Sequence, residues 1–232
     1  MQPGDVLGEA WALYKAHWRH FLSLALLVFV VLSLISLVLS LVLGWFGAVL
    51  ASVVGLVGVF WLQGALAEAV ADVRDGRVDL SISETLHRVR PRVASLLGAG
   101  LLAGLGVALG LILLIVPGLV LLTWWSVIVP VVVLERVAAM ESFGRSRELV
   151  RGYGWNVFGV IVLTVLVLLL AVLVLAIVSA IVLGWLPDGL RGYVQSLAAN
   201  TLTAPFLALA WTLMYFRLRD LRREPEPAPL AA

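Results

Sequence analysis

The chain has 232 residues, of which 62% are apolar and 13% are charged, and its mean hydropathy is +1.10. Soluble domains carry roughly a quarter charged residues, so this composition excludes an ordinary soluble domain and indicates an integral membrane protein. The absence of cysteine excludes disulfides, thiolate metal sites and a cysteine nucleophile. The 16 Lys and Arg residues nearly balance the 14 Asp and Glu residues, so we expect no nucleic-acid partner.

Four stretches without any Asp, Glu, Lys or Arg define the expected fold: 21–67, 93–134, 152–187 and 192–216. A membrane-spanning helix takes about 20 apolar residues, so the first two stretches are each long enough for two helices. Turns are expected at Gly44-Trp45-Phe46-Gly47 and at Pro117-Gly118, because Gly and Pro interrupt helices. We predict an all-α integral membrane protein with six transmembrane helices. The expected spans are about 21–43, 48–70, 93–115, 118–134, 156–183 and 193–216.

The charges predict the orientation of these spans. With six spans, alternate polar segments lie on the same side of the membrane. Every Lys and Arg except Arg191 then falls on one side, and so do all but one of the Asp and Glu residues. By the positive-inside rule that side is cytoplasmic and holds both termini. We therefore expect a multi-pass protein of the bacterial inner (plasma) membrane. Residues 1–223 form the membrane domain, and the proline-rich residues 224–232 form a disordered cytoplasmic tail.

The approaches to the first, third and fifth predicted spans resemble one another. They read Leu13-Tyr14-Lys15, Leu86-His87-Arg88 and Leu149-Val150-Arg151. Leu13 precedes the Gly44 turn by as many residues as Leu86 precedes Pro117, and this spacing indicates an internal repeat. We predict three tandem hairpins, each preceded by a cytoplasmic amphipathic helix.

Each predicted amphipathic helix has its own sequence signals. In the first, one apolar face suits the headgroup plane of the membrane. That face consists of Leu7, Trp11, Tyr14, Trp18 and Phe21. In the second, Ser81 and Glu84 match a capping box. The third covers about 138–151, with Glu141 and Arg145 at the i,i+4 spacing of an ion pair and Gly152 as its stop.

Small residues form a stripe along the third predicted span. Ala99, Ala103, Gly106 and Gly110 follow one another at i, i+4, i+7 and i+11. Such a stripe lets a helix approach closely, either within this chain or in a homo-oligomer. In both cases we expect the third span to lie at the centre of the fold.

Few polar side chains fall inside the predicted spans. Asn200, Thr201 and Thr203 lie just before Pro205, which leaves the Thr201 carbonyl without its helical donor. The neighbouring polar side chains would satisfy this carbonyl, which favours a kink over a substrate site. Two acids, Glu68 and Glu135, end spans on the cytoplasmic side, where each is expected to pair with an arginine or to reach water.

The segment from Glu141 to Trp155, ESFGRSRELVRGYGW, is the most specific local signal. It places Arg145, Arg147, Arg151 and Trp155 near the cytoplasmic headgroups, where anionic lipid stabilises each basic residue by about 1 kcal/mol. Two interpretations stay open. The residues either orient and anchor the protein, or they contact a defined anionic lipid headgroup or a protein partner.

Signals for catalysis, metals and cofactors are missing from the sequence. It contains no Gly-x-Ser-x-Gly elbow, His-Glu-x-x-His pair or Walker loop, and His17 and His20 lack a third ligand. We therefore predict a non-enzymatic protein without a cofactor that acts as a membrane scaffold or binds anionic lipid. The alternative is a small-molecule or lipid transporter that uses the Pro117 break and the polar residues of the last span.

Two segments resemble a known family. The first joins Pro130-Val-Val-Val-Leu-Glu135 to the run from Ser142 to Gly152 and to Trp155, and the second extends from Pro205 to Arg219. They resemble the membrane domain fused to some bacterial glycerophosphoryl diester phosphodiesterases, and free-standing six-span proteins of that type. The resemblance implies the six-span fold. The family's phosphodiesterase activity belongs to a separate soluble barrel, so the resemblance implies neither that activity nor any catalytic residue here.

Overall fold

The computed structural model describes residues 2–74 and 80–222, and within these ranges the protein contains helices and no strand. The helices are α1 (Pro3–Ala16), α2 (Trp18–Val73), α3 (Ile82–Val89), η1 (Arg90–Arg92), α4 (Val93–Leu113), α5 (Ile115–Trp124), α6 (Ile128–Leu134), α7 (Ala139–Val150), α8 (Gly154–Val182) and α9 (Asp188–Leu221). Five helical segments are long and apolar enough to cross a membrane. The all-α prediction is therefore confirmed, and the segments fit a membrane protein. The predicted tail over 224–232 lies outside the described residues.

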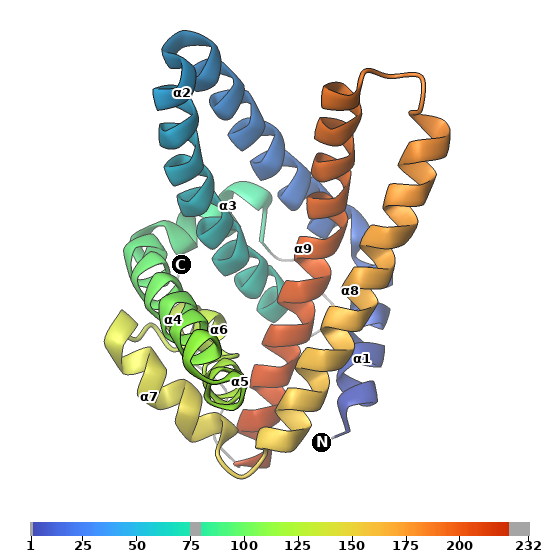
Figure 1. Ribbon diagram of the computed structural model, residues 1–232. Helices are drawn as coiled ribbons and strands as arrows, with labels where there is room; N and C mark the ends of the chain where they lie inside the picture. The colour runs from blue at the N-terminus through green and yellow to red at the C-terminus, as the bar shows by residue number, and fades with distance from the viewer. Residues whose placement is uncertain (1, 75–79, 223–232) are drawn as a thin grey trace.

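Long helical arms project from the fold in pairs (Figure 1). The first pair lies within α2, where Gly44 has a φ of 58° that interrupts the helix and that glycine adopts without strain. The arms 18–43 and 45–73 fold back on each other, and Gly58 lies against the side chain of Leu32. A second pair, α8 and α9, is joined at 183–187. The structure thus places a turn at Gly44, as the sequence predicted, and joins the fifth and sixth predicted spans through 183–187.

Prolines break two other helices, but not where the sequence predicted. Helix α4 ends at Leu113, and Pro117 lies in the first turn of α5 instead of in a turn with Gly118. A proline ring clashes with the carbonyl four residues earlier but fits the first turn of a helix, so the break precedes the proline. The expected span over 118–134 falls within a helical segment, Ile115–Leu134, that is long and apolar enough to cross a membrane. Residues 125–127 divide it into α5 and α6, and Pro130 lies in the first turn of α6.

Helix α9 forms the centre of the structure. Its second half is buried almost continuously from Ala204 to Arg219, and it contacts α1, α2, α6, α7 and α8. Helix α4 buries Leu96, Ala99 and Gly110 and lies at the periphery. The expectation that the third span is central is therefore wrong. The larger side chains of α9 fill the middle of the protein. The small residues of α4 allow this helix to pack closely against α5 at the edge of the protein.

The short helices follow their sequence signals in part. The Ser81–Glu84 capping box is formed, with the Ser81 hydroxyl accepting from the Glu84 amide at 3.2 Å. Gly152, with a φ of 90°, follows α7 as expected. Helix α1 buries Val6, Leu7 and Ala10 against the rest of the protein, whereas Trp11 of the predicted apolar face is 52% exposed. The buried residues of α1 pack against α8 and α9.

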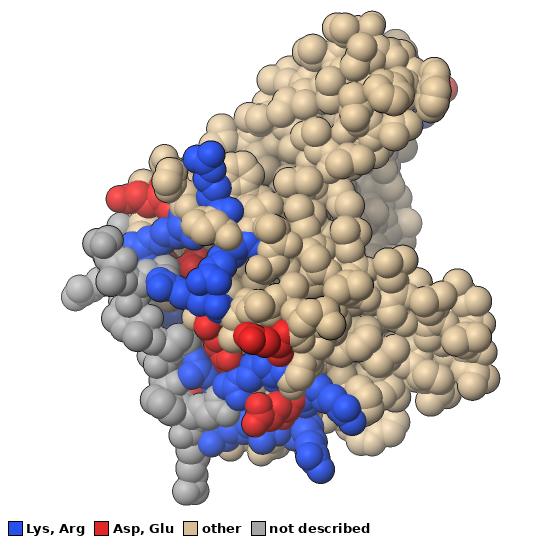
Figure 2. Space-filling model, turned by 90° about the vertical axis from the view of Figure 1, so that its left-hand side faces the viewer, with Lys and Arg blue, Asp and Glu red and all other residues tan. Residues whose placement is uncertain are grey.

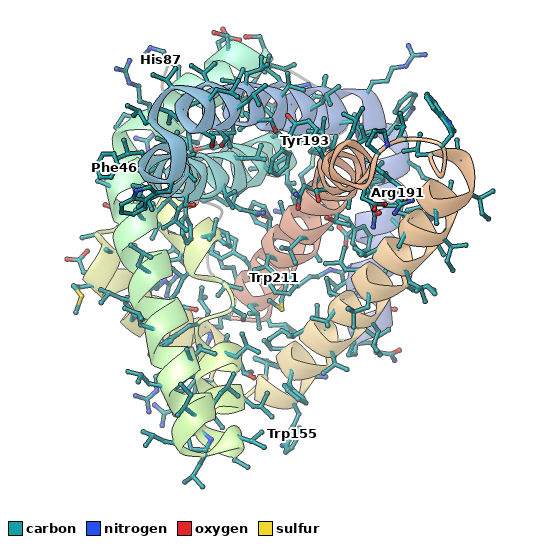
Figure 3. All side chains as sticks on the ribbon, turned by 45° about the horizontal axis from the view of Figure 1, so that its top comes forward. Phe46, His87, Trp155, Arg191, Tyr193 and Trp211 are labelled. Carbon is teal, nitrogen blue, oxygen red and sulfur yellow. The ribbon has the colours of Figure 1, made fainter. Side chains whose placement is uncertain are left out.

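Charged and apolar surfaces occupy opposite parts of the molecule. Figure 2 shows Lys, Arg, Asp and Glu side chains gathered on one side, from which apolar lobes project. Near the ends of the arms, Leu41, Ile112 and Ile181 are 76%, 80% and 77% exposed. Figure 3 shows Phe46 and Arg191 at well-separated ends of the structure. Apolar exposure on this scale is typical of a surface that faces lipid.

The small-residue stripe packs within this chain. Ala99 is buried, Ala103 packs against the core, Gly106 faces the ring of Trp125, and Gly110 lies against the backbone of Gly118. A Cβ atom at Gly110 would lie 2.9 Å from the Cα atom of Gly118. The pairing of α4 with α5 therefore depends on the missing side chain at Gly110.

A Gly110→Ala substitution is expected to lower the free energy of unfolding by about 1–3 kcal/mol, because the added methyl meets backbone that cannot rotate away. Gly104→Ala on the same helix is the matched control, since a Cβ atom at Gly104 meets nothing within 4 Å. Thermal unfolding of the purified variants in detergent measures the difference. Equal stability of the two variants would contradict the close α4–α5 packing.

Candidate functional site

A partly buried polar cluster joins the end of α6 to α7 and α9. The Glu135 carboxylate accepts two hydrogen bonds from Arg145, at 2.7 Å from Nε and 3.1 Å from Nη2. The Tyr215 hydroxyl donates to the same carboxylate at 3.0 Å and accepts from Nη1 of Arg219 at 3.1 Å. The Nε atom of Arg219 lies 3.9 Å from Glu135 Oε1. We call these four residues the Glu135 cluster.

The cluster is sheltered from solvent. The side chains of Glu135, Arg145 and Arg219 are 14%, 22% and 10% exposed. A bidentate arginine–carboxylate pair is strong and geometrically specific, and a sheltered pair is screened little by salt. The cluster therefore holds α7 in a fixed position against α9.

The backbone after α6 brings Arg145 back toward Glu135. Arg136 has a φ of 58°, a left-handed conformation that is uncommon for residues other than glycine and costs about 1–2 kcal/mol. Its carbonyl accepts a hydrogen bond from Nη1 of Arg92 at 2.9 Å, which holds the turn in place. The left-handed residue ends α6 and redirects the chain into α7.

The predicted pairing of Glu141 with Arg145 is not formed. Glu141 instead accepts from the Ala138 amide at 3.3 Å at the start of α7. Arg145 pairs with Glu135 and, at 3.2 Å, with Glu148. A sheltered bidentate pair outweighs an exposed i,i+4 pair, which is worth only a few tenths of a kcal/mol.

The three remaining members of the predicted basic segment lie on the surface. The exposed Arg147 guanidinium stacks over the Trp124 ring, 4.2 Å from its centroid. Arg151 is also exposed, and its backbone carbonyl accepts from Nη2 of Arg222 at 2.7 Å. Trp155 is 87% exposed and points away from the helices in Figure 3. We call Arg147, Arg151 and Trp155 the basic surface.

The polar residues of the last predicted span do not converge. Thr203 donates to the Ala199 carbonyl at 2.7 Å, Thr201 is buried without a hydrogen-bond partner, and Asn200 is exposed. Tyr14 reaches this part of α9 from α1 and donates to the Leu202 carbonyl at 3.1 Å. Burial raises the pKa of Tyr14, so its hydroxyl stays a donor.

The two acids at predicted span ends lie in different surroundings. Glu135 pairs with an arginine, as expected. Glu68 is 5% exposed, and Arg88 and Arg136 supply positive charge near it. Among the described residues, no group of three or more His, Asp or Glu side chains could hold a metal ion.

Sequence reasoning missed Tyr215 and Arg219 as members of the site. Their i,i+4 spacing places both on one face of α9, which is the signal that could have found them. Arg219 was instead assigned to the cytoplasmic anchoring charges, together with the neighbouring arginines.

Comparisons of the chain with protein-family models, with curated proteins and with solved structures find no match. The resemblance to the phosphodiesterase-associated membrane domain therefore stays a prediction.

Replacing Glu135 with Gln is expected to lower the free energy of unfolding by about 3–5 kcal/mol, because the Arg145 guanidinium loses its bidentate carboxylate partner in a sheltered position. Glu148→Gln is the matched control. This substitution also removes a partner of Arg145, but the Glu148 side chain is 61% exposed. It should therefore change the free energy of unfolding by only about 0–1 kcal/mol. Thermal unfolding in detergent measures both variants. Similar losses in the two would show that the Glu135 cluster does not hold α7 in place.

Proposed function

We propose that the protein crosses the bacterial inner membrane six times, with its charged face and both termini in the cytoplasm. The break at Gly44 divides α2 into two arms, and α4, α5 with α6, α8 and α9 supply the other spans. Helix α4 has 21 residues, about 31 Å long, against a hydrocarbon core of about 30 Å. The positive-inside rule supports the orientation.

The proposed role is that of a non-enzymatic scaffold whose basic surface binds the headgroup of an anionic lipid. The observation that carries this proposal is the contrast between Arg145 and its neighbours. Arg145 is paired with Glu135 and Glu148, whereas Arg147 and Arg151 are exposed and form no ion pair with a described residue. These two guanidinium groups are available to a phosphate.

The surroundings of the basic surface suit binding at a headgroup. The Trp124 ring supports the Arg147 guanidinium, and the exposed indole of Trp155 suits the interfacial zone where tryptophans concentrate. The Glu135 cluster fixes α7, so less ordering is required when a lipid binds.

The transporter alternative has less support. It requires the polar side chains of the last span to converge on one cavity, and Asn200, Thr201 and Thr203 point to different surroundings. A second copy of the chain or another membrane protein as partner stays a prediction.

The double substitution Arg147→Gln with Arg151→Gln tests the lipid site and leaves Arg145 intact. Each arginine is worth about 1 kcal/mol toward anionic lipid, so affinity for phosphatidylglycerol should fall about fivefold per residue. Native mass spectrometry of protein released from lipid nanodiscs should show one fewer retained phosphatidylglycerol.

Arg191→Gln is the control, because Arg191 pairs with Asp188 near the α8–α9 turn. Its lipid retention should equal that of the unchanged protein. If the double variant retains as much phosphatidylglycerol as this control, the basic surface does not bind lipid.

A further inference from the structure

An open groove of about 490 Å³ lies between the start of α2 and the first half of α9. Its walls are apolar, with Leu22 and Leu26 on one side and Val194 and Leu197 on the other. The two helices run in opposite directions in Figure 1, so one end of the groove lies at the α1–α2 junction. The residues that line the groove belong neither to the Glu135 cluster nor to the basic surface.

The length of the groove matches one leaflet of a membrane. On α2 the lining residues extend from Trp18 to Leu26. At 1.5 Å per residue they cover about 12 Å, against about 15 Å for half of the hydrocarbon core. The groove therefore suits the hydrocarbon chain of a lipid within one leaflet.

A positive charge lies at the junction end of the groove. Arg19 lines it, is exposed, and stacks over the Trp18 ring at 5.5 Å from the centroid. Arg19 forms no ion pair with a described residue. An arginine and a tryptophan at the end of an apolar helix are typical of the headgroup zone.

An unpartnered hydroxyl is buried in the wall of the same groove. Thr201 lines it and is 7% exposed, and its Oγ1 atom has no hydrogen-bond partner. Buried polar groups are hydrogen-bonded in most proteins, so an unpartnered one indicates a missing partner. The other hydroxyl in the groove, of Ser23, already donates to the Arg19 carbonyl at 2.6 Å.

We propose that this groove binds an anionic phospholipid. One acyl chain lies along Leu22, Leu26, Val194 and Leu197, and the phosphate pairs with Arg19. The Thr201 side chain, buried in the wall of the empty groove, rotates about its Cα–Cβ bond so that its hydroxyl donates to an ester oxygen. This site is separate from the basic surface, so either site can fail without the other.

Native mass spectrometry of protein from nanodiscs of equal phosphatidylglycerol and phosphatidylcholine tests the proposal. Ala198→Trp fills the groove and should remove one retained lipid. Ala180→Trp, which places the same side chain on the exposed surface of α8, should remove none. The Arg19→Gln variant should still bind a lipid through its acyl chain. Its preference for phosphatidylglycerol over phosphatidylcholine should fall about fivefold, since one arginine is worth about 1 kcal/mol.

Thr201→Val keeps the shape of the side chain and removes the hydroxyl, so it tests the site without filling the groove. It should fold as the unchanged protein does and retain less lipid. Unchanged lipid retention in both Ala198→Trp and Thr201→Val would overturn the proposal, as would an unchanged preference in Arg19→Gln. A dimer that leaves the groove without lipid would also overturn it, because a second copy would then be the occupant.

Discussion

Apolar helices in lipid gain little from hiding apolar surface against one another, so their arrangement depends on close packing and on polar contacts. In this protein the decisive polar contact is made by one carboxylate. Glu135 joins Arg145 of α7 to Tyr215 of α9, with Arg219 close by. The segments that it connects lie far apart in the sequence. Without it, Arg145 would lose its bidentate partner and keep the exposed Glu148, and the position of α7 would depend on weaker contacts.

This constraint separates two kinds of arginine within a few residues. Arg145 belongs to the interior and shapes the protein, whereas Arg147 and Arg151 remain on the surface and are open to ligands. The groove between α2 and α9 also has an exposed arginine, since Arg19 lies beside its apolar wall. The charged face and the apolar arms are the features on which the proposed lipid-binding role rests.

The sequence predicted the features that depend on local chemistry. Charge-free stretches identified the long helices, Gly44 identified a turn, and Ser81 with Glu84 identified a cap. The break predicted at Pro117 lies before that residue, because a proline acts on the carbonyl four residues earlier. The interruption at 125–127 was not predicted. The central position of α9 and the contact between Glu135 and Tyr215 depend on tertiary packing, which no local pattern encodes.

The central claim is that apolar arms enter the membrane from one charged cytoplasmic face. Because the chain has no cysteine, single substitutions can report on each side. Trp45→Cys and Trp185→Cys place thiols near the ends of arms, and Met140→Cys places one on α7. A membrane-impermeant maleimide added to intact spheroplasts should label the first two variants, and should label the third only after permeabilisation. If Met140→Cys were labelled in intact spheroplasts while Trp45→Cys and Trp185→Cys were not, the charged face would lie outside the cytoplasm and the proposed orientation would be wrong.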